Sequence, residues 1–301
     1  MPFLQLTVDI GASDPAPFED ALLAAGAVSI TLQDAADNPV LEPAPGTTPL
    51  WPSVQLSALF DAAVDPHLLQ EVLRSRLSVP LLPLRFEYLA DRAWEREWLK
   101  DFRPMQFGRR LWICPGGQRP PVDQLATAGD ACIIELDPGL AFGTGTHPTT
   151  ALCLEWLDGA DLRGNTVIDY GCGSGVLAIA ALKLGAKSAI AVDIDPQAVT
   201  ATLDNASRNL VAERIRVGIV VGTELQPADV VLANILAEPL EALSASLTSL
   251  VVPGGHIILS GLLATQADRV AARYARAFRL EPVTVRGDWA RVDGVRQPAA
   301  G

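Results

Sequence analysis

The chain has 301 residues, 49% of them hydrophobic and 19% charged, which is enough for two ordinary domains and excludes disorder throughout. Its formal net charge of −12 argues against nonspecific binding to nucleic acid and is compatible with a basic partner or a small ligand. No apolar stretch is long enough for a membrane span, and the four cysteines form no CxxC pair or disulfide framework. We therefore expect a protein of the reducing cytoplasm, without a metal site and away from membranes.

The first region alternates apolar and polar residues, as half-buried strands do. Strands are expected around residues 4–10, 28–32, 54–60 and 84–88, and helices after Asp14-Pro15 and Asp65-Pro66. The order β-α-β-β-α-β predicts a small ferredoxin-like domain over residues 1–88. That fold by itself names no function.

Residues 89–110 are predicted to connect two domains. Trp94, Trp98 and Phe102 recur at helical spacing, which indicates an amphipathic helix that packs its aromatic rings on a neighbour. The same helix could act as a hinge that orients the two domains.

From residue 111 to residue 301 the pattern changes to short apolar strands separated by helices. This alternation predicts an α/β domain whose mostly parallel sheet is covered on both faces. The expected strands are 167–170, 189–194, 215–220, 229–234 and 255–260, and the expected helices are 176–185, 196–210 and 238–250. In such sheets ligands bind at the carboxyl ends of the strands.

A glycine loop follows the first of these strands. Asp169 is followed by Gly171, Gly173 and Gly175, and Asp193 ends the next strand, where an acid can accept both hydroxyls of a ribose. A dinucleotide fingerprint has the spacing G-x-G-x-x-G, whereas this loop has G-x-G-x-G beside an acid. Because that acid would repel a pyrophosphate but tolerate an ammonium or sulfonium group, the loop favours S-adenosylmethionine over NAD.

Residues 139–150 read GLAFGTGTHPTT and precede a helix. The stretch lacks the lysine of a P-loop, so phosphate binding is not expected. We interpret it as a flap that closes over the cofactor. Phe142 would shield the ligand, and Thr144, Thr146 and Thr150 would offer uncharged hydroxyl groups to it.

His147 has no partner at metal-ligand spacing, because His67 and His256 are remote and no HxxxH or HxH motif occurs. We therefore expect a structural histidine that hydrogen-bonds the loop, in preference to a catalytic one. Thr149 or Thr150 is predicted to cap the following helix.

Asn234 stands where an apolar strand ends. Its amide can both donate and accept hydrogen bonds, so it could hold the cofactor, or an incoming amine as a catalytic residue. The alternative is an asparagine that only closes a turn.

The strings DPGLAFGTGTHPTT, VIDYGCGSGVLAIAALKLGA, AVDIDPQAV and ANILAEPL closely resemble the ribosomal protein L11 methyltransferase family. The resemblance implies a seven-stranded, Rossmann-like class I methyltransferase domain, and a small N-terminal domain that grips the substrate. It implies S-adenosylmethionine as cofactor, contacted by Thr150, Gly171, Asp193 and Asn234. The implied substrate is ribosomal protein L11, free or nascent, methylated on lysine side chains and on its N-terminal amine. We expect a monomer that does not bind nucleic acid directly.

Three alternatives stay open on the sequence alone. The chain could methylate another protein lysine, a small amine or RNA, although its acidic charge disfavours RNA. It could be a regulatory module that binds a nucleoside without catalysis. An NAD oxidoreductase is disfavoured by the glycine spacing.

Overall fold

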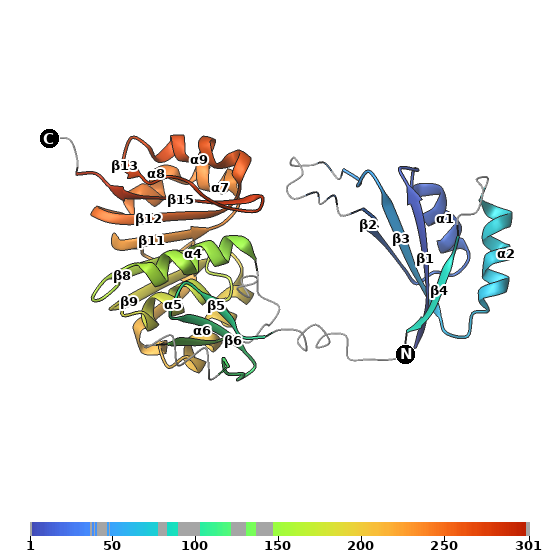
Figure 1. Cartoon of the computed structure of the whole chain (residues 1–301), viewed down its shortest axis with the longest axis horizontal. Coiled ribbons are helices and arrows are strands. Elements are labelled where there is room, and N and C mark those ends of the chain that lie inside the picture. Colours follow the sequence, from blue (N-terminus) through green and yellow to red (C-terminus); the bar gives the residue numbers. More distant parts are fainter. Residues whose placement is uncertain are drawn as a thin grey trace. The chain divides into compact units, whose positions relative to one another are not determined.

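The computed structural model describes residues 2–36, 38, 40, 47, 49–77, 83–89, 103–121, 131–136 and 147–298. The chain forms two compact units, residues 1–97 and residues 98–301, which we call the N-terminal and the C-terminal unit (Figure 1). Within the described residues, no helix is both long and apolar enough to cross a membrane.

In its described residues, the N-terminal unit is an antiparallel sheet with two helices, and its strand order is β2-β3-β1-β4. Its elements, in chain order, are β1 (Phe3–Gly11), α1 (Ala16–Ala24), β2 (Ser29–Asp34), β3 (Val54–Asp61), α2 (Pro66–Arg76) and β4 (Arg85–Leu89). The order of elements is the one expected from the sequence, and it is the order of a ferredoxin-like unit.

The core of this unit follows from the alternation in β1 and β3. Leu4 and Leu6 are fully buried, and they stand opposite Phe60 and Ala58 of β3 in the antiparallel register. Because side chains alternate across a strand, these residues share the sheet face on which the helices bury their own apolar residues. Asp65 begins α2 by accepting a hydrogen bond from the His67 N–H, as its place before a proline predicts.

The C-terminal unit contains an eight-stranded sheet and a three-stranded one. Its strands are β5 (Met105–Phe107), β6 (Leu111–Pro115), β7 (Cys132–Leu136), β8 (Thr166–Tyr170), β9 (Ser188–Asp193), β10 (Ile215–Ile219), β11 (Ala228–Asn234), β12 (Val251–Leu263), β13 (Phe278–Leu280), β14 (Thr284–Arg286) and β15 (Trp289–Arg296). Its α-helices are α4 (Pro148–Gly159), α5 (Val176–Lys183), α6 (Pro196–Arg208), α7 (Ala237–Ala242), α8 (Ser244–Ser249) and α9 (Ala267–Tyr274).

The large sheet has the order β10-β9-β8-β11-β12-β15-β13, and β14 pairs with β15 off this path. The five strands from β10 to β12 are parallel, whereas β15 is antiparallel to β12, β13 and β14. From β8 the chain adds β9 and β10 on one side of the sheet, and then adds β11 and β12 on the other side. A ligand crevice forms at such a switch point, outside the carboxyl ends of the strands.

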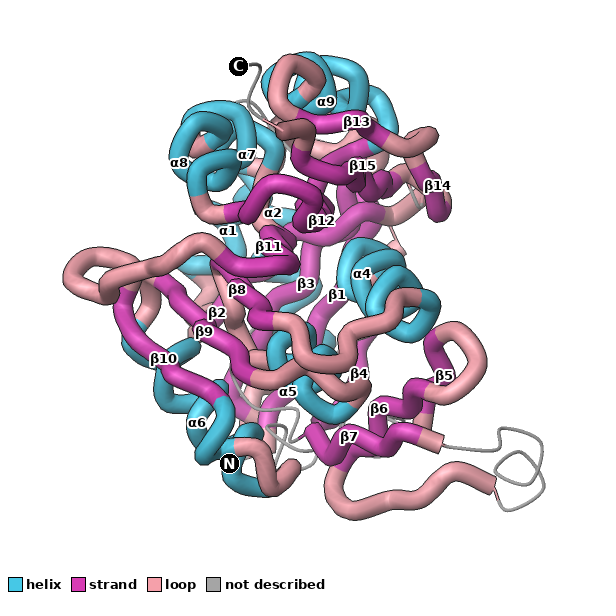
Figure 2. Tube along the Cα trace, turned by 90° about the vertical axis from the view of Figure 1, so that its left-hand side faces the viewer, coloured by secondary structure: helices cyan, strands magenta, loops and turns pink. Residues whose placement is uncertain are grey.

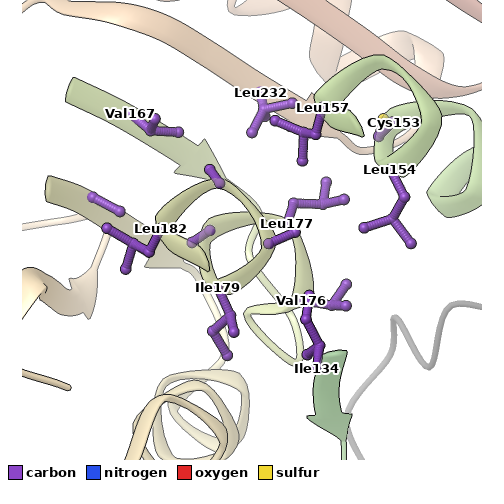
Figure 3. Close-up of a cluster of buried hydrophobic side chains, with 14 of the residues drawn as sticks. Ile134, Cys153, Leu154, Leu157, Val167, Val176, Leu177, Ile179, Leu182 and Leu232 are labelled. Atoms are coloured by element: carbon purple, nitrogen blue, oxygen red, sulfur yellow. The ribbon is translucent and has the colours of Figure 1, made fainter. Parts of the chain in front are cut away.

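Helices cover both faces of this sheet, as the sequence predicted (Figure 2). On one face α4, α5 and the small sheet pack around Val167 and Leu232, and Figure 3 shows Leu177 of α5 pointing into this cluster. On the other face α7, α8 and α9 pack around Ile168 and Val231. Neighbouring residues of one strand therefore belong to opposite cores, which is why these strands are apolar throughout.

The sequence prediction was wrong in one helix and incomplete in the sheet. The expected helix over residues 238–250 is divided into α7 and α8 at Leu243, whose ψ of 5° departs from helical geometry. The implied seven strands are those of the main path, and the short β14 is an eighth.

Residues 105–107, which were expected to belong to the connector, form β5 and pair with β6 in the small sheet. The turn between these strands is held by Asp158 at the end of α4, whose carboxylate accepts the Arg109 N–H at 2.7 Å and the Arg110 N–H at 3.2 Å. Trp94, Trp98 and Phe102, and with them the predicted connector helix, lie outside the described residues.

Candidate active site

Three of the predicted site residues lie at the same edge of the large sheet. In the parallel registers Tyr170 of β8 stands beside Val192 of β9 and Ala233 of β11. The residues that follow Tyr170, Val192 and Ala233 in the chain are Gly171, Asp193 and Asn234. These three therefore lie side by side across the switch point. A ligand at this edge can contact all three at once.

The glycine loop takes conformations that only glycine adopts at low cost. Gly171, Gly173 and Gly175 have φ values of 80°, 53° and 78°. A Cβ atom at Gly171 would also come closer than 3.0 Å to Ile235 Cγ2, the side chain next to Asn234. The loop therefore combines a left-handed backbone with a close approach to the neighbouring strand.

Two polar side chains of α6, which the sequence motifs did not indicate as site residues, hold this loop. Thr202, fully buried, donates its hydroxyl to the Gly173 carbonyl at 3.0 Å, and Asn205 donates its amide to the Ser174 carbonyl at 2.9 Å. The sequence signal that could have identified them is their spacing of three residues, which places both on one face of the helix. Buried polar side chains on an otherwise apolar face need a hydrogen-bond partner.

Asp169 is a buried carboxyl group with a hydrogen-bond partner, among the described residues, for one of its two oxygens. Its Oδ2 accepts the Ala178 N–H in the first turn of α5 at 3.0 Å, while its Oδ1 has no partner among the described residues. Burial raises the pKa of Asp169 to about 7; the Ala178 hydrogen bond lowers this pKa, and the nearby Asp193 raises it. A cationic ligand group beside Oδ1 would favour the ionised form.

Replacing Asp169 with asparagine is expected to stabilise the free protein at alkaline pH. Because the folded-state pKa is raised, the wild type loses stability as the pH rises from about 4 through 7, whereas asparagine does not titrate. The amide avoids the buried charge but keeps an unpaired polar atom, so we expect a net gain of about 1–3 kcal/mol at pH 8. Thermal unfolding of both proteins at pH 5 and pH 8 checks this. An equal difference in melting temperature at the two pH values would contradict it.

Asp193 connects the end of β9 to the glycine loop. Its Oδ2 accepts the Gly173 N–H at 2.9 Å and its Oδ1 accepts the Asp195 N–H at 3.0 Å. A carboxylate has about four acceptor positions, so both oxygens keep capacity for ligand hydroxyl groups. Ile194, the next residue, is 82% exposed and adds an apolar surface beside the acid.

Asn234 and Thr150 meet although they are far apart in the sequence. The Asn234 Nδ2 donates to the Thr150 hydroxyl at 3.2 Å, and the Asn234 Oδ1 is buried without a partner among the described residues. Thr150 itself is 2% exposed. Both residues are expected at the site from the sequence pattern, which gives no sign of the hydrogen bond between them.

The predicted cap of α4 was wrong. The helix begins at Pro148, so Thr149 and Thr150 lie inside its first turn, and the side chain of His147 caps it by accepting the Thr149 N–H. His147 Nδ1 also lies 2.7 Å from the Thr149 hydroxyl, and its ring packs edge-on against Trp289. Burial lowers the pKa of His147, in keeping with a neutral, accepting ring.

Phe142, Thr144 and Thr146, with most of the expected flap, lie outside the described residues. In the described part of the chain, no three histidine, cysteine, aspartate or glutamate side chains cluster as a metal site requires. The edge of the sheet thus offers two carboxylates, an open amide oxygen and a glycine loop that admits close approach. Such a site fits a polar ligand with positive charge, and S-adenosylmethionine has this chemistry.

Comparison with known proteins decides the family. The family model "Ribosomal protein L11 methyltransferase (PrmA)" matches residues 2–297. This chain belongs to the ribosomal protein L11 methyltransferase family. The match extends over both units. It therefore confirms the family resemblance, which was based on motifs of the C-terminal unit, over nearly the whole chain.

Individual relatives of the ribosomal protein L11 methyltransferase family agree with this assignment. The chain is 51% identical to a ribosomal protein L11 methyltransferase of Sodalis glossinidius and 50% identical to one of Pseudomonas putida (strain W619), covering 99% of this chain and 100% of each relative. A solved ribosomal protein L11 methylase from Lactobacillus delbrueckii subsp. bulgaricus is 33% identical with a TM-score of 0.57, covering 65% of this chain and 99% of that one. The predicted methyltransferase fold, enzyme class and S-adenosylmethionine cofactor are confirmed.

Proposed function

We propose that this enzyme transfers methyl groups from S-adenosylmethionine to lysine side-chain and N-terminal amines of ribosomal protein L11. One observation carries the proposal: one oxygen each of Asp169 and Asn234, without a partner among the described residues, is buried at the edge of the sheet where Asp193 and the glycine loop meet. Two open acceptors beside a second carboxylate suit a cationic donor and an amine. The substrate named for the relatives supports the choice of protein.

Each residue has a distinct part in holding the cofactor. Asp193 would accept the ribose hydroxyl groups, and Asp169 would face the positively charged amino-acid end. Gly171 and Gly173 leave room for the ligand to approach the backbone. Phe142, Thr144, Thr146 and Thr150 are assigned to the same site by the sequence pattern.

The amine must arrive neutral, with its lone pair directed at the methyl group. Bound S-adenosylmethionine supplies a methyl carbon that is already electrophilic. A lysine in water has a pKa of about 10.4, and removal from water lowers it, so a closed site favours the reactive form. Asn234 would accept an N–H of this amine. Transfer would join the methyl carbon to the amine nitrogen and leave the cofactor sulfur as a neutral thioether, and the methylated ammonium would release its proton to water.

The N-terminal unit is proposed to bind the protein substrate, with the part of the predicted connector that precedes β5 as the hinge. Several target amines on one protein require several orientations of the substrate, which a recognition domain on a movable connector could supply. The net charge of −12 complements a basic ribosomal protein. We further propose that the enzyme acts in the cytoplasm as a monomer, on free or nascent protein, without binding nucleic acid directly.

Incubation of unmethylated ribosomal protein L11 with the enzyme and S-adenosylmethionine is expected to raise its intact mass in whole methyl steps. Fragment-ion mass spectrometry then places the methyl groups on lysines or on the N-terminal amine.

Asn234→Ala serves as the control and should methylate slowly; because Asn234 is also an expected cofactor contact, its Kd for S-adenosylmethionine is measured alongside. An unchanged mass with the wild type, although calorimetry shows cofactor binding, would refute this substrate. The search would then move to other protein lysines and small amines.

A further inference from the structure

A hollow of about 530 Å³ lies at the edge of the large sheet that is opposite to the cofactor site. Its lining includes Trp156, Leu162, Asn165, Val230, His256 and Arg291, and we call it the ring hollow. Asn165 directly precedes β8 and Val230 lies near the start of β11, whereas the cofactor site lies where these strands end. Gly159, the last residue of α4, also lines the hollow and stands about 14 Å along the helix from Thr150.

The side chains of the ring hollow suit a flat ring. Leu162 and Val230 are 1% and 0% exposed and give it an apolar wall, and the rings of Trp156 and His256 pack edge-on with their centroids 5.4 Å apart. Aromatic side chains of this kind stack with nucleobases. The Asn165 amide and the His256 ring have no hydrogen-bond partner among the described residues, so both can bond the polar edge of such a base.

The carboxylates and guanidinium groups of the ring hollow are already paired. Each forms one ion pair: Arg291 with Asp293 at 2.9 Å, Glu155 with Arg286 at 2.6 Å, and Asp161 with Arg163 at 2.7 Å. The ring hollow therefore has no uncompensated charge from these groups, which favours an uncharged ring as its occupant.

A second hollow, of about 410 Å³, adjoins the ring hollow across residues 159–161, which line both. Its lining also contains Asp158 and three arginines, Arg109, Arg110 and Arg163, so we call it the arginine hollow. Two of these guanidinium groups are bound by an acid. Asp158 accepts the Arg110 Nε–H at 3.3 Å, and the two oxygens of Asp161 accept the Arg163 Nε–H and NH2 at 2.8 and 2.7 Å.

Arg109 supplies the positive charge that remains in the arginine hollow. Its guanidinium group has no partner among the described residues, while its backbone N–H is held by the Asp158 carboxylate at the turn between β5 and β6. The Asp158 side chain is only 4% exposed, so this turn has a rigid support. All three guanidinium groups keep free N–H donors, and such planar groups match the geometry of phosphate oxygens.

We propose that the two hollows together bind a nucleoside phosphate, with its base in the ring hollow and its phosphate in the arginine hollow. Only residues 159–161 separate the hollows, so one small molecule can reach both. S-adenosylmethionine carries a base but no phosphate, so it leaves the arginine hollow without a ligand. The net charge of −12 disfavours a long polyanion, which favours a free nucleotide over RNA.

The test is calorimetric titration of the full-length enzyme with adenosine monophosphate (AMP), in phosphate-free buffer with S-adenosylmethionine at saturation. The cofactor is present because the base could otherwise enter the cofactor site. AMP is expected to bind with a Kd below about 1 mM. Adenosine and inorganic phosphate, which each lack one half of the contacts, should bind at least about tenfold more weakly. The absence of AMP binding below this limit would overturn the proposal.

Variants on the two sides of the site test its two halves. Arg109→Ala and Asn165→Ala should each raise the Kd for AMP about tenfold. Arg276→Ala is the matched control for Arg109→Ala, because Arg276 is also exposed, has no partner among the described residues and lines neither hollow. It should leave the Kd for AMP within about twofold. Equal affinities of Arg109→Ala and Arg276→Ala would contradict the assigned phosphate position.

Two further outcomes would overturn the proposal. Loss of AMP binding at saturating S-adenosylmethionine would place the nucleotide in the cofactor site. A short single-stranded RNA that binds more tightly than AMP, with the same sensitivity to Arg109→Ala, would make the two hollows an RNA contact. None of these measurements uses a protein substrate, so their result is independent of the proposed methylation of ribosomal protein L11.

Discussion

Replacing Gly171 with alanine is expected to lower stability by about 2–5 kcal/mol and to weaken the binding of S-adenosylmethionine at least tenfold. The φ of 80° is unfavourable for any residue with a Cβ atom, and that atom would overlap Ile235 Cγ2. Relief of the overlap must move the glycine loop or the segment after Asn234. Thermal unfolding and calorimetry with S-adenosylmethionine measure the two effects.

Gly164→Ala is the matched control for Gly171→Ala. Gly164 has nearly the same φ, 81°, but is exposed, and a Cβ atom there would meet nothing within 4 Å. It should cost only the backbone strain of about 1–2 kcal/mol and leave cofactor affinity within twofold. If both variants lose the same stability and bind cofactor equally well, the close approach to Ile235 does not matter for this site.

Replacing Asp193 with alanine is expected to weaken cofactor binding by about 1.5–3 kcal/mol, which is one to two decades in Kd. The carboxylate would accept the ribose hydroxyls, and it also accepts the Gly173 and Asp195 N–H groups. Loss of the Asp193 carboxylate therefore removes ligand contacts, and it also removes a hydrogen bond that holds the glycine loop. Calorimetric titration with S-adenosylmethionine gives the affinity directly.

Asp204→Ala controls for the loss of one negative charge near the site. Asp204 is exposed on α6, the helix that holds the glycine loop. Its replacement should leave Kd unchanged within a factor of two, since exposed charges are screened by water and salt. An unchanged affinity in Asp193→Ala itself would show that the ribose assignment is wrong.

Much of the C-terminal unit could be predicted because its signals are local. Strands buried on both faces are short apolar runs, and a glycine loop before an apolar helix requires left-handed backbone at fixed positions. Asp169, Asp193 and Asn234 could be placed at one edge because parallel strands end on the same side of the sheet. By contrast, α7 and α8 share one continuous apolar pattern, and nothing in it indicated the break at Leu243.

The family, the cofactor class and the strand ends that carry the site could all be predicted from local sequence, since each depends on residues close together in the chain. Which side chains hydrogen-bond to each other follows instead from how the folded chain packs. Thr150 and Asn234 lie 84 residues apart, and Thr202 reaches Gly173 across 29 residues. Such pairs depend on how α4 and α6 pack on the sheet. That one oxygen each of Asp169 and Asn234 lacks a partner among the described residues likewise follows only from the folded arrangement, because hydrogen bonding of a buried group is decided by its surroundings in space.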